Sequence, residues 1–153
     1  MRKAILMMLT ALLLGASTTW AGPIEDAGAA YSRGDYATAL KIMRPLAVQD
    51  NQLAQFALGT LYEDGKGVVQ DYVEAVKWYR LSAAQGYARA QFVLGTMYGK
   101  GQGVVQDYTE AVKWFKLAAA QGNAVAQYNL GVIYDNGRGV VHDYTEAMKW
   151  FKL

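Results

Sequence analysis

The chain has 153 residues, of which 53% are hydrophobic, with 15 Lys and Arg, 13 Asp and Glu, and no cysteine. So small a net charge gives no electrostatic reason to expect nucleic acid or an anionic membrane surface as a partner. The lack of cysteine excludes disulfides and a thiol nucleophile, so an apolar core alone must hold the fold.

The first 21 residues have the pattern of a secretory signal peptide. Two basic residues precede an apolar run from Ala4 to Ala16, and Thr19 and Ala21 place small residues before a cut after Ala21. The run is too short to span a bilayer comfortably. We therefore expect a secreted protein, periplasmic in a Gram-negative bacterium, with no membrane anchor after cleavage. Removal of the two basic residues leaves 13 basic and 13 acidic side chains in residues 22–153.

Residues 23–51 predict a first, shorter helix hairpin. Its segment "GDYATALKIMRPLAVQDNQLA" begins at Gly34 and shares a register with later sequence, since Asp35 and Tyr36 precede Asp71 and Tyr72 by 36 positions. The turn of this copy, "SRGDY", lacks the extra connector residues of the later copies.

Three longer copies follow, over residues 52–87, 88–123 and 124–153. Their matching segments begin at Ala54, Ala90 and Ala126, again 36 residues apart without insertions. A fixed period of this size is typical of stacked repeats. The sequence therefore predicts an all-α solenoid of antiparallel helix hairpins with about four repeats, of which the last is incomplete.

Each long copy reads as two helices. The first is expected from about Ala54 to Glu63, where apolar residues recur at helical spacing. The second begins after Asp71, whose side chain can accept from free backbone N–H groups, and Glu74 completes a capping-box pattern. Glu74 and Lys77 are close enough to pair.

The connector "DGKGVVQDY", residues 64–72, superficially resembles a phosphate or calcium loop. A phosphate loop needs Ser or Thr after its lysine and a strand before it, but Lys66 is followed by glycine. A calcium loop over residues 135–146 would have glycines at ligand positions three and five, and Val140 at the sixth position, where glycine is required. We interpret these segments as connectors and expect no metal or cofactor.

Three further features of the connectors and helices are expected to repeat. Gly65 and Gly67 would let the chain reverse, with Val68 and Val69 covering the hairpin end. Glycines inside the first helix, at 59, 95 and 131, would permit close approach of the second helix at Ala75, Ala111 and Ala147, respectively. The tryptophans are expected in the core between repeats, because a packing solution must repeat with the fold; they are Trp78, Trp114 and Trp150.

The pattern Leu58-Gly59-x-x-Tyr62, followed by Ala75-x-x-x-Tyr79, resembles the tetratricopeptide core. The period of 36, the Gly-x-Gly-Val connector and "EAVKWYRLSAAQG" together resemble the Sel1-like repeat, a relative of the tetratricopeptide repeat. The resemblance is strong from Gln52 onward, whereas residues 23–51 are closer to a tetratricopeptide hairpin. It implies a solenoid whose concave side is lined by the first helix of each hairpin and binds a protein or peptide.

By this resemblance, ten positions would face the partner: Leu53, Phe56, Thr60, Glu63, Arg89, Phe92, Thr96, Val125, Tyr128 and Val132. Inter-repeat packing is an equal alternative for the aromatic residues of this set. Ala57 and Val93 stand where relatives that clamp a terminal carboxylate have asparagine, and only Asn129 matches. The resemblance therefore does not imply recognition of an acidic tail.

No catalytic group emerges from the sequence. The single histidine, His142, stands where other copies have glutamine, and no Ser-x-x-Lys follows the first 21 residues. We therefore expect a scaffold without enzymatic activity. The alternative is an envelope-associated enzyme modulator or weak hydrolase of cell-wall or β-lactam-type substrates, which only family association suggests. The last copy stops at Leu153 without a polar capping helix, which predicts self-association or fraying there.

Overall fold

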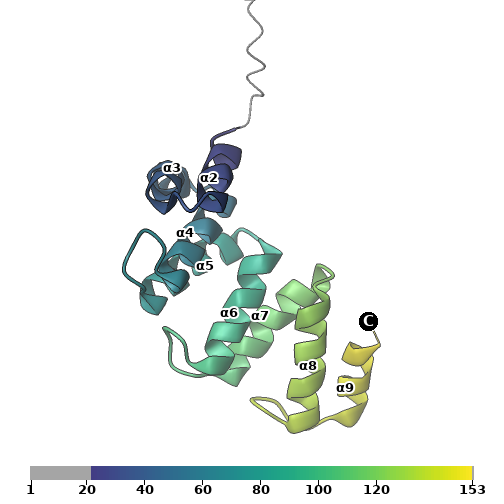
Figure 1. Cartoon of the computed structure of the whole chain (residues 1–153). Helices are drawn as coiled ribbons and strands as arrows, with labels where there is room; N and C mark the ends of the chain where they lie inside the picture. The colour runs from purple at the N-terminus through teal and green to yellow at the C-terminus, as the bar shows by residue number, and fades with distance from the viewer. Residues whose placement is uncertain (1–21, 153) are drawn as a thin grey trace, which may run out of the picture.

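The computed structural model describes residues 22–152, which form eight helices and no strand (Figure 1). The helices are α2 (Pro23–Ser32), α3 (Tyr36–Val48), α4 (Gln52–Asp64), α5 (Tyr72–Ala84), α6 (Ala88–Lys100), α7 (Tyr108–Ala120), α8 (Ala124–Asn136) and α9 (Tyr144–Phe151). The predicted all-α class is confirmed. The proposed signal peptide, with its cleavage after Ala21, lies outside the described residues. Within residues 22–152, no helix combines the length and the apolar character needed to cross a membrane.

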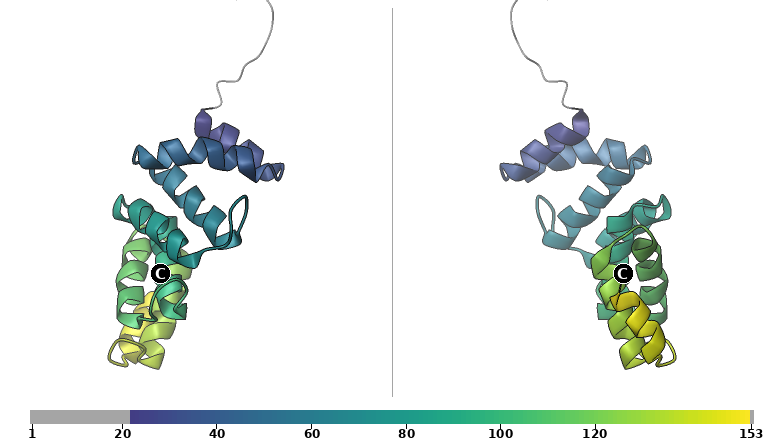
Figure 2. Two further views of the ribbon diagram at one scale, coloured as in Figure 1. Left: turned by 90° about the vertical axis from the view of Figure 1, so that its left-hand side faces the viewer. Right: turned by 90° about the vertical axis from the view of Figure 1, so that its right-hand side faces the viewer.

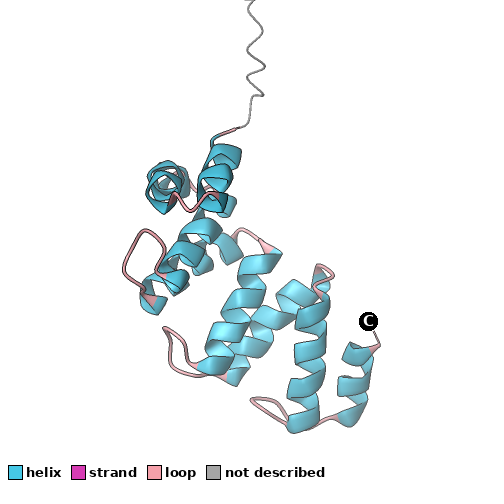
Figure 3. Ribbon diagram, in the orientation of Figure 1, coloured by secondary structure: helices cyan, strands magenta, loops and turns pink. Residues whose placement is uncertain are grey.

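Consecutive helices pair into four hairpins, and each helix packs mainly on its neighbours in the chain. Figure 3 shows the long connectors α4–α5, α6–α7 and α8–α9 projecting on the lower left side of the stack. Figure 2 shows α2 and α3 running in a different direction from α8 and α9, so the stack turns along its length. The predicted solenoid of hairpins is confirmed.

The connector residues form the predicted turn and cap. Gly65 has φ +66°, a left-handed conformation that ends α4, and the Asp71 carboxylate accepts from the Glu74 backbone N–H at 3.0 Å. The reciprocal half of the capping box does not form. Instead, the Asp71 N–H donates to the Tyr62 carbonyl at 2.9 Å, and the Glu74 carboxylate accepts from Lys77 Nζ at 2.6 Å. The predicted Glu74–Lys77 pair is therefore confirmed.

The second glycine of each connector also touches the preceding repeat. Gly67 has φ +72°, and a Cβ built on it would lie 3.0 Å from the Tyr36 Cβ. Gly103 approaches Tyr72, and Gly139 approaches Tyr108, in the same way. The connectors are thus inter-repeat contacts as well as reversals of the chain.

The two connector valines have different environments, which corrects the expectation that both cover the hairpin end. Val68 is half-buried, and its equivalents Val104 and Val140 pack against the core. Val69 is 88% exposed, as are its equivalents in the next two repeats.

The glycines inside the first helices do allow close approach, but the neighbouring residue differs from the predicted one. A Cβ on Gly59 would lie 2.6 Å from ring carbons of Tyr79, and a Cβ on Gly95 would lie 2.6 Å from Phe115 Cδ1. Side chains of a helix lean toward its amino end, so the ring of Tyr79, one turn beyond Ala75, reaches back over the glycine.

The tryptophans lie in the predicted inter-repeat core. Trp78 on α5 packs against a cluster from α2, α3 and α4, while Trp114 and Trp150 pack against the clusters formed with their preceding repeats. The buried indole Nε1 atoms of these three residues have no hydrogen-bond acceptor among residues 22–152. The indoles therefore contribute apolar area rather than polar bonds to the junctions.

Buried glutamines, which no sequence motif marks, also join neighbouring repeats. Gln91 on α6 is 4% exposed; its Nε2 donates to the Ala83 carbonyl at 3.2 Å, and its Oε1 accepts from Gln121 at 2.8 Å. Gln55 on α4 makes the same pair of bonds with Ala47 and Gln85. Each such amide satisfies the carboxyl end of a preceding helix inside the stack.

Candidate partner-binding surface

The first helices of the four hairpins, α2, α4, α6 and α8, form what we call the helix-A face. The structure reveals a common register along them. Ala27-Gly28-x-x-Tyr31 in α2 matches Leu58-Gly59-x-x-Tyr62 in α4, so Gly28 is equivalent to Gly59 and Gly95. The match is hidden in the sequence because the N-terminal connector is five residues shorter. Tyr31 and Asp35 are four positions apart, whereas Tyr62 and Asp71 are nine apart.

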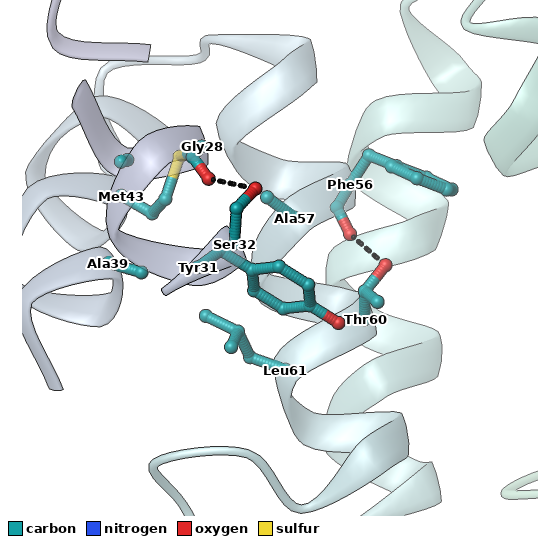
Figure 4. Close-up of a pocket in the computed structure, with 10 residues that line it drawn as sticks. Gly28, Tyr31, Ser32, Ala39, Met43, Phe56, Ala57, Thr60 and Leu61 are labelled. Atoms are coloured by element: carbon teal, nitrogen blue, oxygen red, sulfur yellow. Dashed lines mark hydrogen bonds between the residues drawn. The ribbon is translucent and has the colours of Figure 1, made fainter. Parts of the chain in front are cut away.

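A cavity of about 360 Å³, the α2–α4 pocket, opens between the first two of these helices (Figure 4). It is lined by Ala27, Gly28, Tyr31, Ser32, Ala39, Met43, Phe56, Ala57, Thr60 and Leu61. The Ser32 hydroxyl donates to the Gly28 carbonyl at 2.9 Å and the Thr60 hydroxyl to the Phe56 carbonyl at 3.1 Å, as Figure 4 shows. Because both hydroxyl protons are used within their own helices, the pocket is suited to an apolar side chain.

The α2–α4 pocket exists because the N-terminal hairpin lacks an aromatic ring at one place. Met43 occupies the position that Tyr79 and Phe115 occupy in later repeats. A Cβ on Gly28 would meet no atom within 4 Å, whereas the equivalent Gly59 is covered by the Tyr79 ring. The space over Gly28 therefore stays open and adjoins the pocket.

A second cavity, the α6–α8 pocket of about 280 Å³, lies at the equivalent place two repeats later. It is lined by Gly95, Thr96, Gly99, Lys100, Tyr108, Phe115, Asn129, Val132, Ile133 and Arg138. Asn129 and Val132 stand at the places of Ala57 and Thr60, so the two pockets share one architecture. They differ in charge, since only the second contains free cationic side chains.

We call the contact between the first helices of two neighbouring hairpins a seam. In the seam between α4 and α6, side chains fill the place that is a pocket in the other two seams. The Tyr79 hydroxyl donates to the Glu63 carboxylate at 2.6 Å and lies 3.2 Å from the Thr60 hydroxyl. Burial, and then the bond to Glu63, raise the pKa of Tyr79 well above its ordinary value. Ser32 and Gly99 stand at the Glu63 position in the seams that hold the pockets, and both are smaller than glutamate.

The ten predicted partner-contact residues divide between these environments. Phe56 and Thr60 line the α2–α4 pocket, and Thr96 and Val132 line the α6–α8 pocket. Four others are exposed: Leu53, Arg89, Val125 and Tyr128. Glu63 and Phe92 are half-buried, and Glu63 is already bonded to Tyr79.

The aromatic residues of this set pack between helices. The Phe56 ring lies 5.4 Å from the Tyr79 ring and 5.1 Å from the ring of Tyr87, the N-cap residue of α6. Phe92 packs on Phe115, with ring centroids 6.0 Å apart. Tyr128, in the last repeat, is 60% exposed. Truncation of Phe92 would therefore disturb the core as well as any partner contact.

Several lining residues were absent from the sequence-based set. Ser32 and Met43 line the first pocket, and Lys100 and Arg138 line the second. The signal that could have found them is the set of positions at which the copies differ, because these positions give each seam its own shape and charge.

The described residues provide few groups for metal binding or acid–base chemistry. Within residues 22–152, no cluster of three or more His, Asp or Glu side chains could hold a metal ion. Neither pocket is lined by a carboxylate or an imidazole, and His142 is exposed on a connector.

Stacked helix hairpins with pockets between their first helices define an α-solenoid interaction domain. The chain belongs to the Sel1 repeat family: the family model described as Sel1 repeat matches residues 52–87, 88–123 and 124–153. Solenoids of this family are typically non-catalytic scaffolds for protein–protein interaction. A comparison with curated proteins found no match.

Solved structures agree with this assignment. The protective antigen c5321 of uropathogenic Escherichia coli, described as having an SLR fold, is 40% identical with a TM-score of 0.81; the match covers 85% of this chain and 29% of that protein. A Sel1 repeat protein from Oxalobacter formigenes is 36% identical with a TM-score of 0.80, over 84% of this chain and 53% of that one. The chain thus spans about half or less of these two relatives.

Cysteine rich protein B of Helicobacter pylori shares the fold at 21% identity and a TM-score of 0.57, over 73% of this chain and 97% of that protein.

Proposed function

We propose that the protein is an extracytoplasmic adaptor that binds a protein or peptide partner on the concave helix-A face of its solenoid. The α2–α4 pocket carries this proposal. It is a cavity of about 360 Å³ whose Ser32 and Thr60 hydroxyls already donate within their helices, so its free surface favours an apolar side chain. Family membership supports a scaffold role, and the pocket is lined by no carboxylate or imidazole.

A pocket-filling substitution tests the proposal. Ser32 is exposed and lines the pocket, so Ser32→Phe places a ring in the cavity without removing core volume. Thr38→Phe is the matched control, because Thr38 is exposed on α3 and does not line the pocket. The protein, immobilised after expression with its own amino-terminal segment, is presented to an envelope extract. One partner retained by wild type and by Thr38→Phe, but lost with Ser32→Phe, is the expected result.

Equal retention by all three proteins would place the partner elsewhere and overturn the role of this pocket. Circular dichroism and urea unfolding of each variant establish that a lost partner reflects the filled cavity rather than an unfolded chain.

The extracytoplasmic location is proposed from the pattern of residues 1–21. Mass spectrometry of the protein purified from bacterial periplasm should show a chain that begins at Gly22. Recovery of the protein only from the cytoplasm, with residues 1–21 attached, would contradict the proposal.

Self-association of the last hairpin stays a prediction. Tyr128 on α8, and Tyr144 and Phe151 on α9, are exposed there. Burial of this surface in a second copy would stabilise a dimer through its apolar area. Sedimentation over a range of concentrations tests the prediction, and a strict monomer would count against it.

A further inference from the structure

We propose that the α6–α8 pocket binds a carboxylate group of the partner peptide, an inference that rests on the proposed function. Besides Thr96, whose hydroxyl donates to the Phe92 carbonyl of its own helix, four side chains with hydrogen-bond donors line this cavity of about 280 Å³: Lys100, Tyr108, Asn129 and Arg138. They come from α6, α7, α8 and the following connector, so only the folded stack brings them together.

The charge of the pocket is uncompensated. Among residues 22–152, no carboxylate lies within ion-pair distance of Lys100 or Arg138. The guanidinium of Arg138 lies 5.7 Å from the centre of the Tyr108 ring, which positions it at the pocket. Lys100 and Arg138 line the cavity as exposed residues, so an incoming anion can reach them, and a cation without its own counter-ion is suited to such an anion.

The α2–α4 seam shows how the same positions can be neutral. Lys66, the equivalent of Arg138, pairs with Asp64 at 3.0 Å and donates to the Tyr31 hydroxyl at 2.7 Å. In the last repeat, Asn136 stands at the Asp64 position, and its amide donates to the Val132 carbonyl at 2.7 Å. The change from aspartate to asparagine therefore leaves Arg138 without the partner that its equivalent has.

Lys100 extends this difference. It lines the α6–α8 pocket, whereas Arg33, which holds the equivalent place directly after α2, does not line the α2–α4 pocket. The α6–α8 pocket is thus lined by two cationic side chains, neither of which is paired within residues 22–152.

Two neutral donors complete the site. The Tyr108 hydroxyl accepts from Gln106 Nε2 at 3.2 Å, so its own proton is free to donate. The Asn129 amide has no hydrogen-bond partner among the described residues. An ionised carboxylate, whose two oxygens accept several bonds, matches this excess of donors, and its charge-assisted bonds are about twice as strong as neutral ones.

These groups differ from the clamp of chaperone-binding relatives, for which the sequence matched only Asn129. Here the cations come from the end of α6 and from the connector after α8. A search of the equivalent clamp positions therefore does not reveal them.

Three matched probes separate the sources of the carboxylate. N-acetylglutamic acid α-amide has a side-chain carboxylate, N-acetylglutamine has only a main-chain carboxylate, and N-acetylglutamine α-amide has neither. Titrations of the full ¹⁵N-labelled protein at constant ionic strength, followed by ¹H–¹⁵N NMR, should show saturable shifts of the Asn129 side-chain amide and the Gly99 backbone amide. A Kd of about 1–10 mM is expected for probes of this size, at about 0.3 kcal/mol per non-hydrogen atom.

Binding of either acidic probe, with at least tenfold weaker binding of the uncharged amide, supports the inference and shows whether a side chain or a chain end is preferred. Arg138→Gln should weaken binding of the acidic probe at least tenfold. The control Lys113→Gln, an exposed lysine on α7 paired with Glu110, should leave it unchanged. No saturation with any probe, or equal shifts in wild type and Arg138→Gln, would overturn the carboxylate site.

The result is independent of the adaptor test. If no probe binds but Ser32→Phe still abolishes capture of the partner, only this inference is refuted. If the acidic probes bind but no partner is captured, only the proposed function is refuted.

Discussion

The α2–α4 and α6–α8 pockets lie at equivalent places two repeats apart, yet one is suited to an apolar group and the other to an anion. Gly28 and Gly95 occupy the same position at the two sites, as do Ala57 and Asn129. The difference comes from the residues that do not repeat. In the first seam Asp64 neutralises Lys66, whereas Arg138 in the later seam has no such partner.

The repeat sets where a pocket can form, and single departures from the repeat set what the pocket can bind. The same reasoning explains the α4–α6 seam between them. There Glu63, at the place of Ser32 and Gly99, is bonded to Tyr79. A stack of similar hairpins can therefore present a row of chemically distinct sites.

The largest effect is expected from adding one methyl group at equivalent glycines. Gly59→Ala should lower the free energy of unfolding by about 1–3 kcal/mol, because its Cβ would lie 2.6 Å from the Tyr79 ring. Gly28→Ala should raise it by about 0.5–1 kcal/mol, because the space over Gly28 is open and alanine favours a helix. Urea midpoints of the two variants measure the contrast. Similar destabilisation by both would show that the seams are packed alike.

A smaller effect is expected at the buried glutamines. Gln91→Ala should lower the free energy of unfolding by about 1–2 kcal/mol, because it leaves the Ala83 carbonyl and the Gln121 amide without this partner. Gln127→Ala should lower the free energy of unfolding less, since the Gln127 side chain makes one hydrogen bond within residues 22–152, to the Ala119 carbonyl. Paired unfolding curves test the order, and a larger cost at Gln127 would contradict it.

The smallest effect is expected at the seam that separates the two pockets. Tyr79→Phe should lower the free energy of unfolding by about 1 kcal/mol, because the Glu63 carboxylate loses a donor while phenylalanine fills the equivalent place in other repeats. Gly59→Ala serves as a reference of larger effect at the same contact. A larger loss of unfolding free energy than that of Gly59→Ala would show that the hydrogen bond, rather than the packing of the ring, contributes most to the stability of this contact.

The Tyr79→Phe variant also tests how the stability depends on pH. Burial and Glu63 raise the pKa of Tyr79 in the folded state, so the folded protein keeps a proton that an unfolded tyrosine releases near pH 10. The contribution of Tyr79 is complete below that pH and falls as the pH rises above it. Between about pH 8 and about pH 10.5, wild type should lose more stability than Tyr79→Phe. Parallel losses would show that Tyr79 ionises normally.

The sequence predicted the local features well because they depend on neighbouring residues. The cap at Asp71 needs only the free N–H groups of the next turn, and the left-handed turn at Gly65 needs only a residue without a side chain. The predicted close approach of the second helix at Gly59 occurs, but the nearest side chain is Tyr79 rather than Ala75, because the lean of the Tyr79 ring depends on how the two helices cross. The capping box is incomplete at Glu74 because the Asp71 N–H donates to the Tyr62 carbonyl of the preceding helix, an acceptor that the local pattern does not reveal.

By itself, the sequence determined the helical repeat, its period of 36 and the membership of its family, because each repeat must bury the same apolar face against its neighbours. Only the tertiary structure decided where the cavities lie and what lines them. The register between Gly28 and Gly59 is hidden by a shorter connector, and Lys100, Asn129 and Arg138 meet across three elements. Cavities of this kind arise from side chains that are distant in the chain, so their chemistry depends on the stacking of the hairpins.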